Sequence, residues 1–248
     1  MYNNYKKRML QYKNNYLKSV IFQINYIPIE QLNTGLNFSL SEFIEKKIGV
    51  KIKETKNINI NITQEKSTTN QFSQWNFLGK TVQLVINNSF FQINTAHYTN
   101  YQEFHPVIID IYNEFEKIYK PAITRIALRY INTISLNDGA TFDFNDIIND
   151  NLLNPTIAFK EDGLSRSIGI MNINNGEGIY TNFLYGFHNS EYPNKISKRE
   201  FVLDYDCFSN SFDVTKDKID FVLQDLRERV NSLFEKSIGN KLRKMMNQ

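Results

Sequence analysis

The chain's first clear pattern is an alternation of apolar and polar residues over residues 20–27. One face of this segment carries Val20, Phe22, Ile24 and Tyr26. The other face carries Gln23 and Asn25. A two-residue period of this kind is typical of a strand with one buried and one open face.

Similar segments recur along the chain and predict an antiparallel sheet. They cover residues 58–62, 82–86, 89–95, 124–134, 167–173, 179–187 and 200–208. Asn87-Asn88 predicts a tight turn, and Asn174-Asn175-Gly176 predicts a second one. Because such short turns join neighbouring strands, we expect the strands to form hairpins.

Two helices are predicted in the first half of the chain. The spacing of Ser39 and Glu42 matches a capping box and predicts a short helix to about Ile48. From about Tyr101 the apolar residues recur at helical spacing, with Thr99 or Asn100 as the cap. Pro106 falls inside this second pattern, where it either kinks the helix or marks its first turn.

A third, long helix is predicted near the C-terminus. Either Asp213 or Thr215 caps it, and Gly239 ends it. Its apolar stripe consists of Ile219, Val222, Leu226, Val230 and Leu233.

An internal repeat emerges when the sequence is shifted by 104 residues. The shift places Phe22, Ile24, Tyr26 and Ile27 on Ile126, Leu128, Tyr130 and Ile131. It also places Phe38, Leu40, Glu42 and Ile44 on Phe142, Phe144, Asp146 and Ile148. A strand and the helix after it therefore share one offset, although a chain so rich in isoleucine also produces apolar matches by chance.

From this repeat we expect one α+β domain over residues 1–248, built from pseudo-repeats 17–120 and 121–248. Each unit would run strand, helix, several antiparallel strands, helix. Joined edge to edge, the two units would form one curved sheet with the helices on one face, an architecture like that of TATA-box-binding folds.

The other face of such a sheet would be uncovered and polar. The residues predicted there are Gln23, Asn25, Gln83, Gln92, Asn94, Arg125, Arg129, Asp204 and Asp206. Amides and a few opposed charges suit hydrogen bonding to a ligand, a peptide or nucleic-acid bases. The alternative is an ordinary solvated face, or one on which Arg129 pairs with Asp204 or Asp206 across strands.

The amino-acid composition limits the classes of protein to which this chain can belong. Hydrophobic residues make up 41% of the chain, enough to bury a core, so disorder is excluded. The formal charge of +3, with both signs interspersed, is not a nucleic-acid footprint. Cys207, the single cysteine, cannot form an intrachain disulfide, and no apolar run approaches the ~20 residues of a membrane span. We expect a cytoplasmic protein without a membrane partner.

No catalytic constellation is recognisable, so we expect no catalytic residues, no metal and no cofactor. Asp204 and Asp206 are two apart on one strand face, a spacing that also suits an acid–base pair or a hard metal. The three histidines are not spaced to complete such a site. The run Asn175-Gly176-Glu177-Gly178 lacks the following helix of a phosphate loop and is better explained as a hairpin turn.

The run Arg125-Ile-Ala-Leu-Arg129-Tyr-Ile-Asn132, with Val20-Ile-Phe-Gln-Ile before it and Val230-Asn-Ser-Leu-Phe234-Glu after it, resembles a known family. This is a sporadically distributed, uncharacterised prokaryotic family of about 250 residues with an R-I-x-L-R-Y-I-N motif, often linked to mobile elements. Ala127 replaces the glycine associated with the motif. The resemblance implies a stand-alone cytoplasmic protein of a defence or toxin-related operon, phage defence included, and carries no family activity.

These observations predict a non-catalytic ligand- or protein-binding component that uses the open polar face. The expected binding residues are Gln23, Asn25, Arg125, Arg129, Asn132, Asp204 and Asp206. Asn132 is included because it matches the family motif. Two alternatives stay open: a nucleic-acid-binding component, and a metal-dependent hydrolase or nuclease that uses the two aspartates. The sequence does not indicate an oligomeric state.

Overall fold

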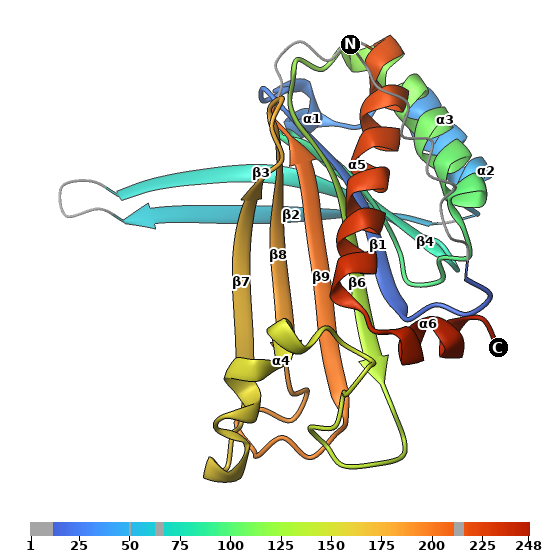
Figure 1. Ribbon diagram of the computed structural model, residues 1–248. Helices are drawn as coiled ribbons and strands as arrows, with labels where there is room; N and C mark the ends of the chain where they lie inside the picture. Colours follow the sequence, from blue (N-terminus) through green and yellow to red (C-terminus); the bar gives the residue numbers. More distant parts are fainter. Residues whose placement is uncertain (1–11, 50, 63–66, 211–215) are drawn as a thin grey trace.

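The computed structural model describes residues 12–49, 51–62, 67–210 and 216–248. Over these residues the chain forms a mixed α+β structure with one antiparallel sheet of nine strands and with six α-helices (Figure 1). The strand order is β2-β3-β4-β5-β1-β6-β9-β8-β7. The prediction of an α+β chain with one large antiparallel sheet is confirmed.

The strands are β1 (Leu17–Tyr26), β2 (Lys51–Ile62), β3 (Ser67–Leu78), β4 (Val82–Asn87), β5 (Phe90–Thr95), β6 (Ile123–Ser135), β7 (Ser167–Asn174), β8 (Ile179–Phe187) and β9 (Glu200–Ser209). The helices are α1 (Gln31–Thr34), α2 (Phe38–Ile48), α3 (Tyr101–Tyr119), α4 (Asp150–Ile157), α5 (Lys216–Ser237) and α6 (Asn240–Met246), with a short 3-10 helix at Lys160–Asp162.

Strands β1 and β6 pair at the centre of the sheet. Phe22 lies opposite Leu128 and Ile24 opposite Ile126, so the apolar sides of both strands share one face. On one side of this central pair lies the first arm, strands β2 to β5, and on the other side lies the second arm, strands β7 to β9. The sheet is strongly twisted, because β2 and β3 run across the view of Figure 1 whereas β7, β8 and β9 run along it.

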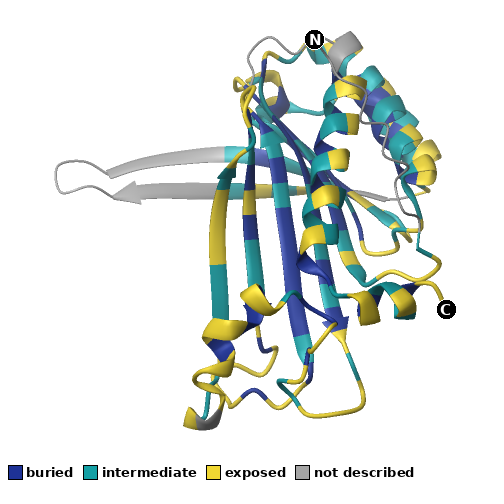
Figure 2. Ribbon diagram, viewed as in Figure 1, coloured by how far each residue is buried: buried dark blue, intermediate teal, exposed yellow. Residues whose placement is uncertain are grey.

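The helices cover the apolar face and bury it in one continuous core. In Figure 1, α5 crosses β6 and β9, while α2 and α3 lie side by side towards the first arm. Ile219, Leu223, Leu226 and Val230 of α5 are fully buried beneath it. Figure 2 shows the consequence, since β6 and β9 are mostly buried and β7 at the edge is mostly not.

The predicted helices near residues 39–48 and 101–120 are confirmed, with one change of cap. Helix α2 is capped by Asn37, whose Oδ1 accepts from the Leu40 backbone N–H, and not by Ser39. Asn100 caps α3, so the choice between Thr99 and Asn100 is resolved. Pro106 lies inside α3. The two candidate caps of α5, Asp213 and Thr215, fall outside the described residues.

The predicted helix at residues 142–148 is wrong. This segment forms turns, and Asp146 adopts a left-handed backbone conformation with φ of 55°. Ile148 makes a β-bridge to Ile238, and the Asp146 carbonyl accepts from the Lys241 N–H. These contacts with the junction of α5 and α6 hold the backbone out of a helix, and the helix of this region, α4, starts only at Asp150.

Candidate binding face

The strand register places the nine predicted polar residues on one face, opposite the helices. Asn25 lies opposite Arg125, and Arg129 lies opposite Asp206. Gln23 lies opposite Gln92, and Gln83 opposite Asn94. We call this surface the open face, defined by Gln23, Asn25, Gln83, Gln92, Asn94, Arg125, Arg129, Asp204 and Asp206. It spans β4, β5, β1, β6 and β9.

Arg129 and Asp204 form a bidentate ion pair at the centre of the second half of this face. Nε of Arg129 donates to Oδ1 of Asp204 at 2.8 Å, and Nη2 donates to Oδ2 at 2.6 Å. The Asp204 side chain is only 9% exposed, whereas that of Arg129 is 43% exposed. Hydrogen bonding to Asp204 raises the pKa of the Arg129 guanidinium above its ordinary value. The Arg129 guanidinium therefore stays charged.

Arg125 and Asp206 form a second ion pair beside the first. Nη2 of Arg125 donates to Oδ2 of Asp206 at 2.8 Å, and both side chains are about one quarter exposed, at 24% each. The Arg125 guanidinium also lies 4.3 Å above the Phe208 ring, which in turn stacks on Tyr180 at 5.7 Å. A cation held by a carboxylate and an aromatic face is fixed in orientation.

The half of the open face formed by β1, β4 and β5 presents amides, and the register also places Ile21, Val85 and Phe90 on this side of the sheet. Nε2 of Gln23 donates to Oδ1 of Asn25 at 2.9 Å. The Ser19 hydroxyl donates to Oδ1 of Asn94 at 2.6 Å. These contacts use part of the hydrogen-bonding capacity of each amide and leave further donors and acceptors for a partner.

Asn132 is the one predicted binding residue that does not lie on the open face. It is 4% exposed on the helix-covered side, and its Nδ2 donates to the Leu203 carbonyl at 3.3 Å. The side chain therefore bonds within the protein. Conversely, sequence reasoning did not include the aromatic pair Phe208 and Tyr180, although Phe208 is two residues from Asp206 and so shares its face.

The open face has no histidine, and its carboxylates are already engaged. His105 contacts Asp220 between α3 and α5, while His97 and His188 follow the ends of β5 and β8. Among the described residues, no three His, Cys, Asp or Glu side chains are grouped to hold a metal ion. Asp204 and Asp206 each face an arginine, so their geometry is that of ion pairs.

Cys207 lies on the covered side of β9, as its position predicts. It is fully buried, and Oγ1 of Thr181 donates to its sulfur at 3.3 Å. Burial raises the pKa of the thiol to about 11. A buried thiol with this pKa is protonated at neutral pH and is a poor nucleophile.

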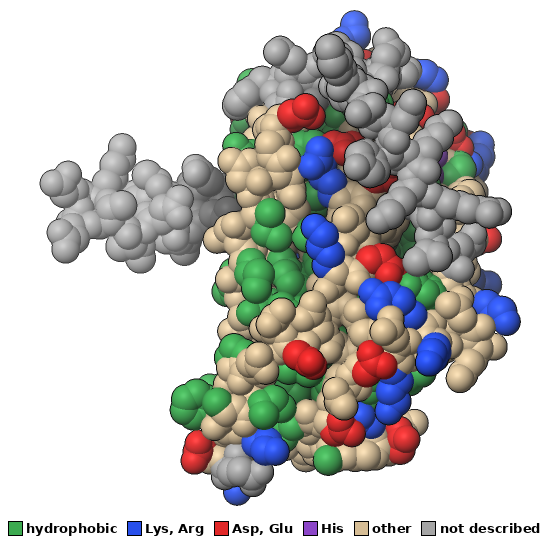
Figure 3. Space-filling view, viewed as in Figure 1, with side chains coloured by type: hydrophobic (Ala, Val, Ile, Leu, Met, Phe, Trp, Pro, Cys, Tyr) green, Lys and Arg blue, Asp and Glu red, His purple; other side chains and the backbone are tan. Residues whose placement is uncertain are grey.

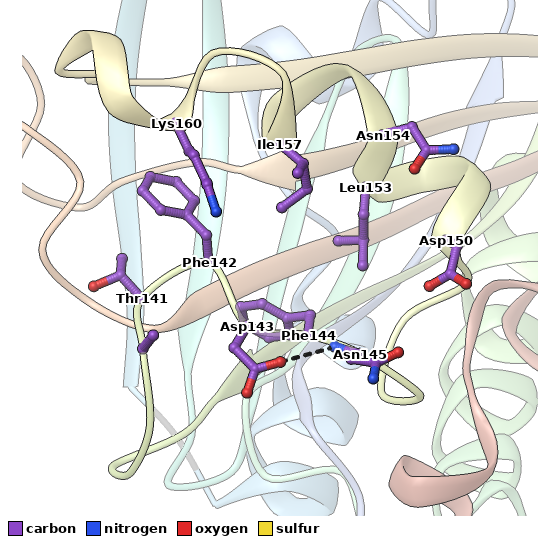
Figure 4. A pocket seen from close by; sticks show the side chains of 11 residues that line it. Thr141, Phe142, Asp143, Phe144, Asn145, Asp150, Leu153, Asn154, Ile157 and Lys160 are labelled. Carbon is purple, nitrogen blue, oxygen red and sulfur yellow. Dashed lines mark hydrogen bonds between the residues drawn. The ribbon is translucent and has the colours of Figure 1, made fainter.

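A separate depression lies between the loop after β6 and helix α4 (Figure 4). Its volume is about 520 Å³, and Phe142, Leu153 and Ile157 supply its apolar side chains. Asp143 lies on its rim and accepts a hydrogen bond from the Asn145 backbone N–H at 3.3 Å. The depression contains none of the predicted binding residues and is open to solvent. We therefore do not regard it as a second candidate site beside the open face.

Comparison of the chain with models of known protein families gives no match, and comparison with curated proteins gives none either. Across the described residues, no helix combines the length and the apolar character needed to cross a membrane.

Proposed function

We propose that this chain is a non-catalytic binding protein whose open face engages a polar, uncharged segment of a partner protein. One observation carries the proposal: a wide sheet face, free of helices over the described residues, presents amides beside two arginines that are already neutralised by aspartates. Directional amide donors and acceptors select a partner by hydrogen-bond geometry rather than by charge.

Charge pairing on the open face argues against the nucleic-acid alternative. Binding to a phosphate backbone releases counterions and requires unpaired cations. Arg129 and Arg125 instead each have a carboxylate within 2.8 Å, which leaves this part of the face without net charge. The same pairing argues against a hydrolase built on the two aspartates, because a metal would have to displace both arginines.

The test compares partner capture by the wild type with capture by variants of exposed open-face residues. Gln83→Arg and Asn182→Arg place a long cation on this face at exposed positions, so folding is preserved. Gln224→Arg and Ser232→Arg, exposed on α5, are the matched controls. We expect proteins co-purified from native cells to be lost with the first pair of variants and retained with the second.

Equal capture by all four variants would overturn the proposal. A salt titration against labelled single- and double-stranded oligonucleotides provides the second arm. We expect no binding at physiological salt. Tight binding with a steep salt dependence would replace the protein partner by nucleic acid.

We also propose that the chain consists of two related units, residues 17–120 and 121–248, arranged as in TATA-box-binding-like folds. Each unit starts with a central strand, β1 or β6. The next strand of the unit lies at the outer edge of the sheet, and the strands after it follow in order back to the centre. In each unit the last strand is followed by a long helix, α3 or α5. The first unit returns through four strands and the second through three.

The position of the C-terminal helix provides a test of this duplication. The Asn14 N–H donates to the Met246 carbonyl at 2.9 Å, so the end of the second unit lies beside the start of the first. A circular permutant that begins at Pro121 and joins residue 248 to residue 12 should therefore fold cooperatively. A permutant that fails to give a cooperative unfolding transition would contradict the equivalence of the units.

The cellular setting rests on the motif at Arg125 to Asn132. We propose that the chain belongs to the sporadic, mobile-element-linked prokaryotic family with this motif and acts in the cytoplasm within a defence or toxin-related operon. Loss of phage resistance on deletion of the gene from its native host supports this setting, and unchanged resistance contradicts it.

A further inference from the structure

The two edges of the sheet differ in how they are protected. Among the described residues, β2 at one edge has the exposed charged side chains Lys53, Glu54 and Lys56. At the other edge, the eight residues of β7, Ser167–Asn174, include no charged side chain and no proline. Charges and prolines on an edge strand are the usual means of preventing its pairing with another chain. The β7 edge lacks both.

The apolar side chains of β7 are accessible. Ile170 is 68% exposed and Met171 is 39% exposed, so both faces of the strand present apolar area. Figure 3 shows hydrophobic side chains gathered over β7 and β8 on the side of the helices. Of the described strands only β8 pairs with β7, and outside this pairing no backbone-to-backbone hydrogen bond among the described residues involves residues 167–174. Its outer backbone groups are therefore available to a new strand.

We propose that two copies of this chain pair antiparallel through β7, about a two-fold axis near Ile170. The sheets of the two copies would then continue into each other, and the open faces would lie on the same side of the joined sheet. Ile170 would face Ile170 of the second copy, and Ile168 would face Asn172. The occupant is a second copy because a neutral strand meets itself without repulsion between like charges.

The charges at the ends of β7 favour this orientation. Arg166 immediately precedes the strand and is exposed, with its guanidinium 4.0 Å above the Tyr192 ring. Glu177 lies in the turn after the strand and is also exposed. In this register Arg166 of each copy lies opposite Asn174 of the other, at the end that leads into the turn with Glu177, so opposite charges lie at the same end of the paired strands. Parallel pairing would place the two arginines together instead.

Sedimentation velocity of the full chain over about 1 µM to 1 mM tests the dimer, because a single strand pair is a small interface and predicts micromolar dissociation. Ile170→Lys would set two lysines against each other and should weaken dimerisation by about tenfold or more. Ile27→Lys, at a loop position that is 56% exposed, is the matched control and should dimerise like the wild type.

Oxidative cross-linking tests the orientation independently. Ile170→Cys should form a disulfide-linked dimer, whereas Ile27→Cys should not, and the buried Cys207 does not contribute. A wild type that is monomeric throughout the range would overturn the proposal. A dimer that is equally stable in the Ile170→Lys variant would overturn it as well. Neither result depends on the binding role of the open face.

Discussion

The two arms of the sheet place their charges in opposite positions. In the first arm the exposed charges are on the edge strand, at Lys53, Glu54 and Lys56, and the open face next to the centre presents amides. In the second arm the edge strand is neutral, and the carboxylates Asp204 and Asp206 lie beside the centre, where they neutralise the arginines of β6. Charged side chains therefore keep one edge of the sheet exposed to water. In the second arm they instead form ion pairs that fix the arginines in the middle of the open face.

The largest expected effect tests whether both arms belong to one cooperative core. Phe91 in the first arm and Phe201 in the second are both fully buried within the same hydrophobic cluster. Replacing either by alanine should lower the free energy of unfolding by about 3–5 kcal/mol. Denaturant unfolding should show one transition that shifts as a whole in both variants. Two separate transitions, of which each variant shifts only one, would show that the arms are independent.

The control for these variants is Phe221→Ala. Phe221 is 62% exposed on α5, so the change should alter the free energy of unfolding by less than about 0.5 kcal/mol.

Alkaline pH should destabilise the central strands and the second arm. Burial raises the pKa values of Tyr26 in β1 and of Tyr130 and Tyr205 in the second half, and it raises the pKa of Cys207 to about 11 from 9.0. Above pH 9 the unfolded chain therefore binds fewer protons than the folded chain, so stability falls as pH rises. Each proton contributes about 1.4 kcal/mol per pH unit between its two pKa values.

Denaturant midpoints at pH 8, 9, 10 and 11 measure this loss, with tyrosinate absorbance as the parallel probe. The stability contribution of Cys207 is complete below pH 9 and is lost as pH rises to about 11. Cys207→Ala should therefore reduce the slope. A flat stability profile over this range would contradict the burial of these groups.

An intermediate effect is expected at the ion pair of the second arm. Arg129→Ala leaves the Asp204 carboxylate, 9% exposed, without its partner and should lower the free energy of unfolding by about 2 kcal/mol. Removing Asp204 as well should restore part of this loss, because the uncompensated charge disappears. In the amide half of the face, Ser19→Ala should lower the free energy of unfolding by only about 1 kcal/mol.

The double-mutant cycle is measured by chemical denaturation. If the double variant is less stable than Arg129→Ala by the full effect of Asp204→Ala, the two side chains do not interact.

The smallest effect is expected at the cap of α2. Asn37→Ala removes the acceptor for the Leu40 N–H and should lower the free energy of unfolding by about 1 kcal/mol. Ser39→Ala, at the position that the capping-box spacing favoured, should change it by less than about 0.5 kcal/mol. Equal losses in the two variants would contradict the observed cap. Thermal unfolding resolves both changes.

The strands next to the centre were predictable because each buries one face and exposes the other. Val20, Phe22 and Ile24 carry this signal clearly, whereas β3 contains mostly polar residues and is missing from the strands predicted above. Strand β3 pairs with β2 along its whole length, so its backbone bonds depend on a partner that local sequence does not reveal. The failed helix at residues 142–148 has a similar cause, because contacts with residues 238–241 determine its backbone.

The membership of the open face was predictable from the two-residue period, but its pairing was not. Arg129 lies directly opposite Asp206 and yet pairs with Asp204, one step along the strand. The twist of the sheet and the rotamer of Arg129 decide between these partners, and both are properties of the folded sheet. The side of Asn132 was predictable, because an odd number of residues separates it from Arg125 and from Arg129, which places it on the covered side of the strand. Only the family motif favoured a binding role for it.

The strand order has a consequence for the growing chain on the ribosome. Strand β1 is synthesised before both of its neighbours, because β5 begins only at Phe90 and β6 only at Ile123. Until β5 has emerged, this largely apolar strand has both edges unpaired, and one edge stays unpaired until β6 follows; closure of such distant contacts is slow. The stretch from Leu17 to Tyr26 is thus where a chaperone would be needed first, and where premature release would lead to aggregation.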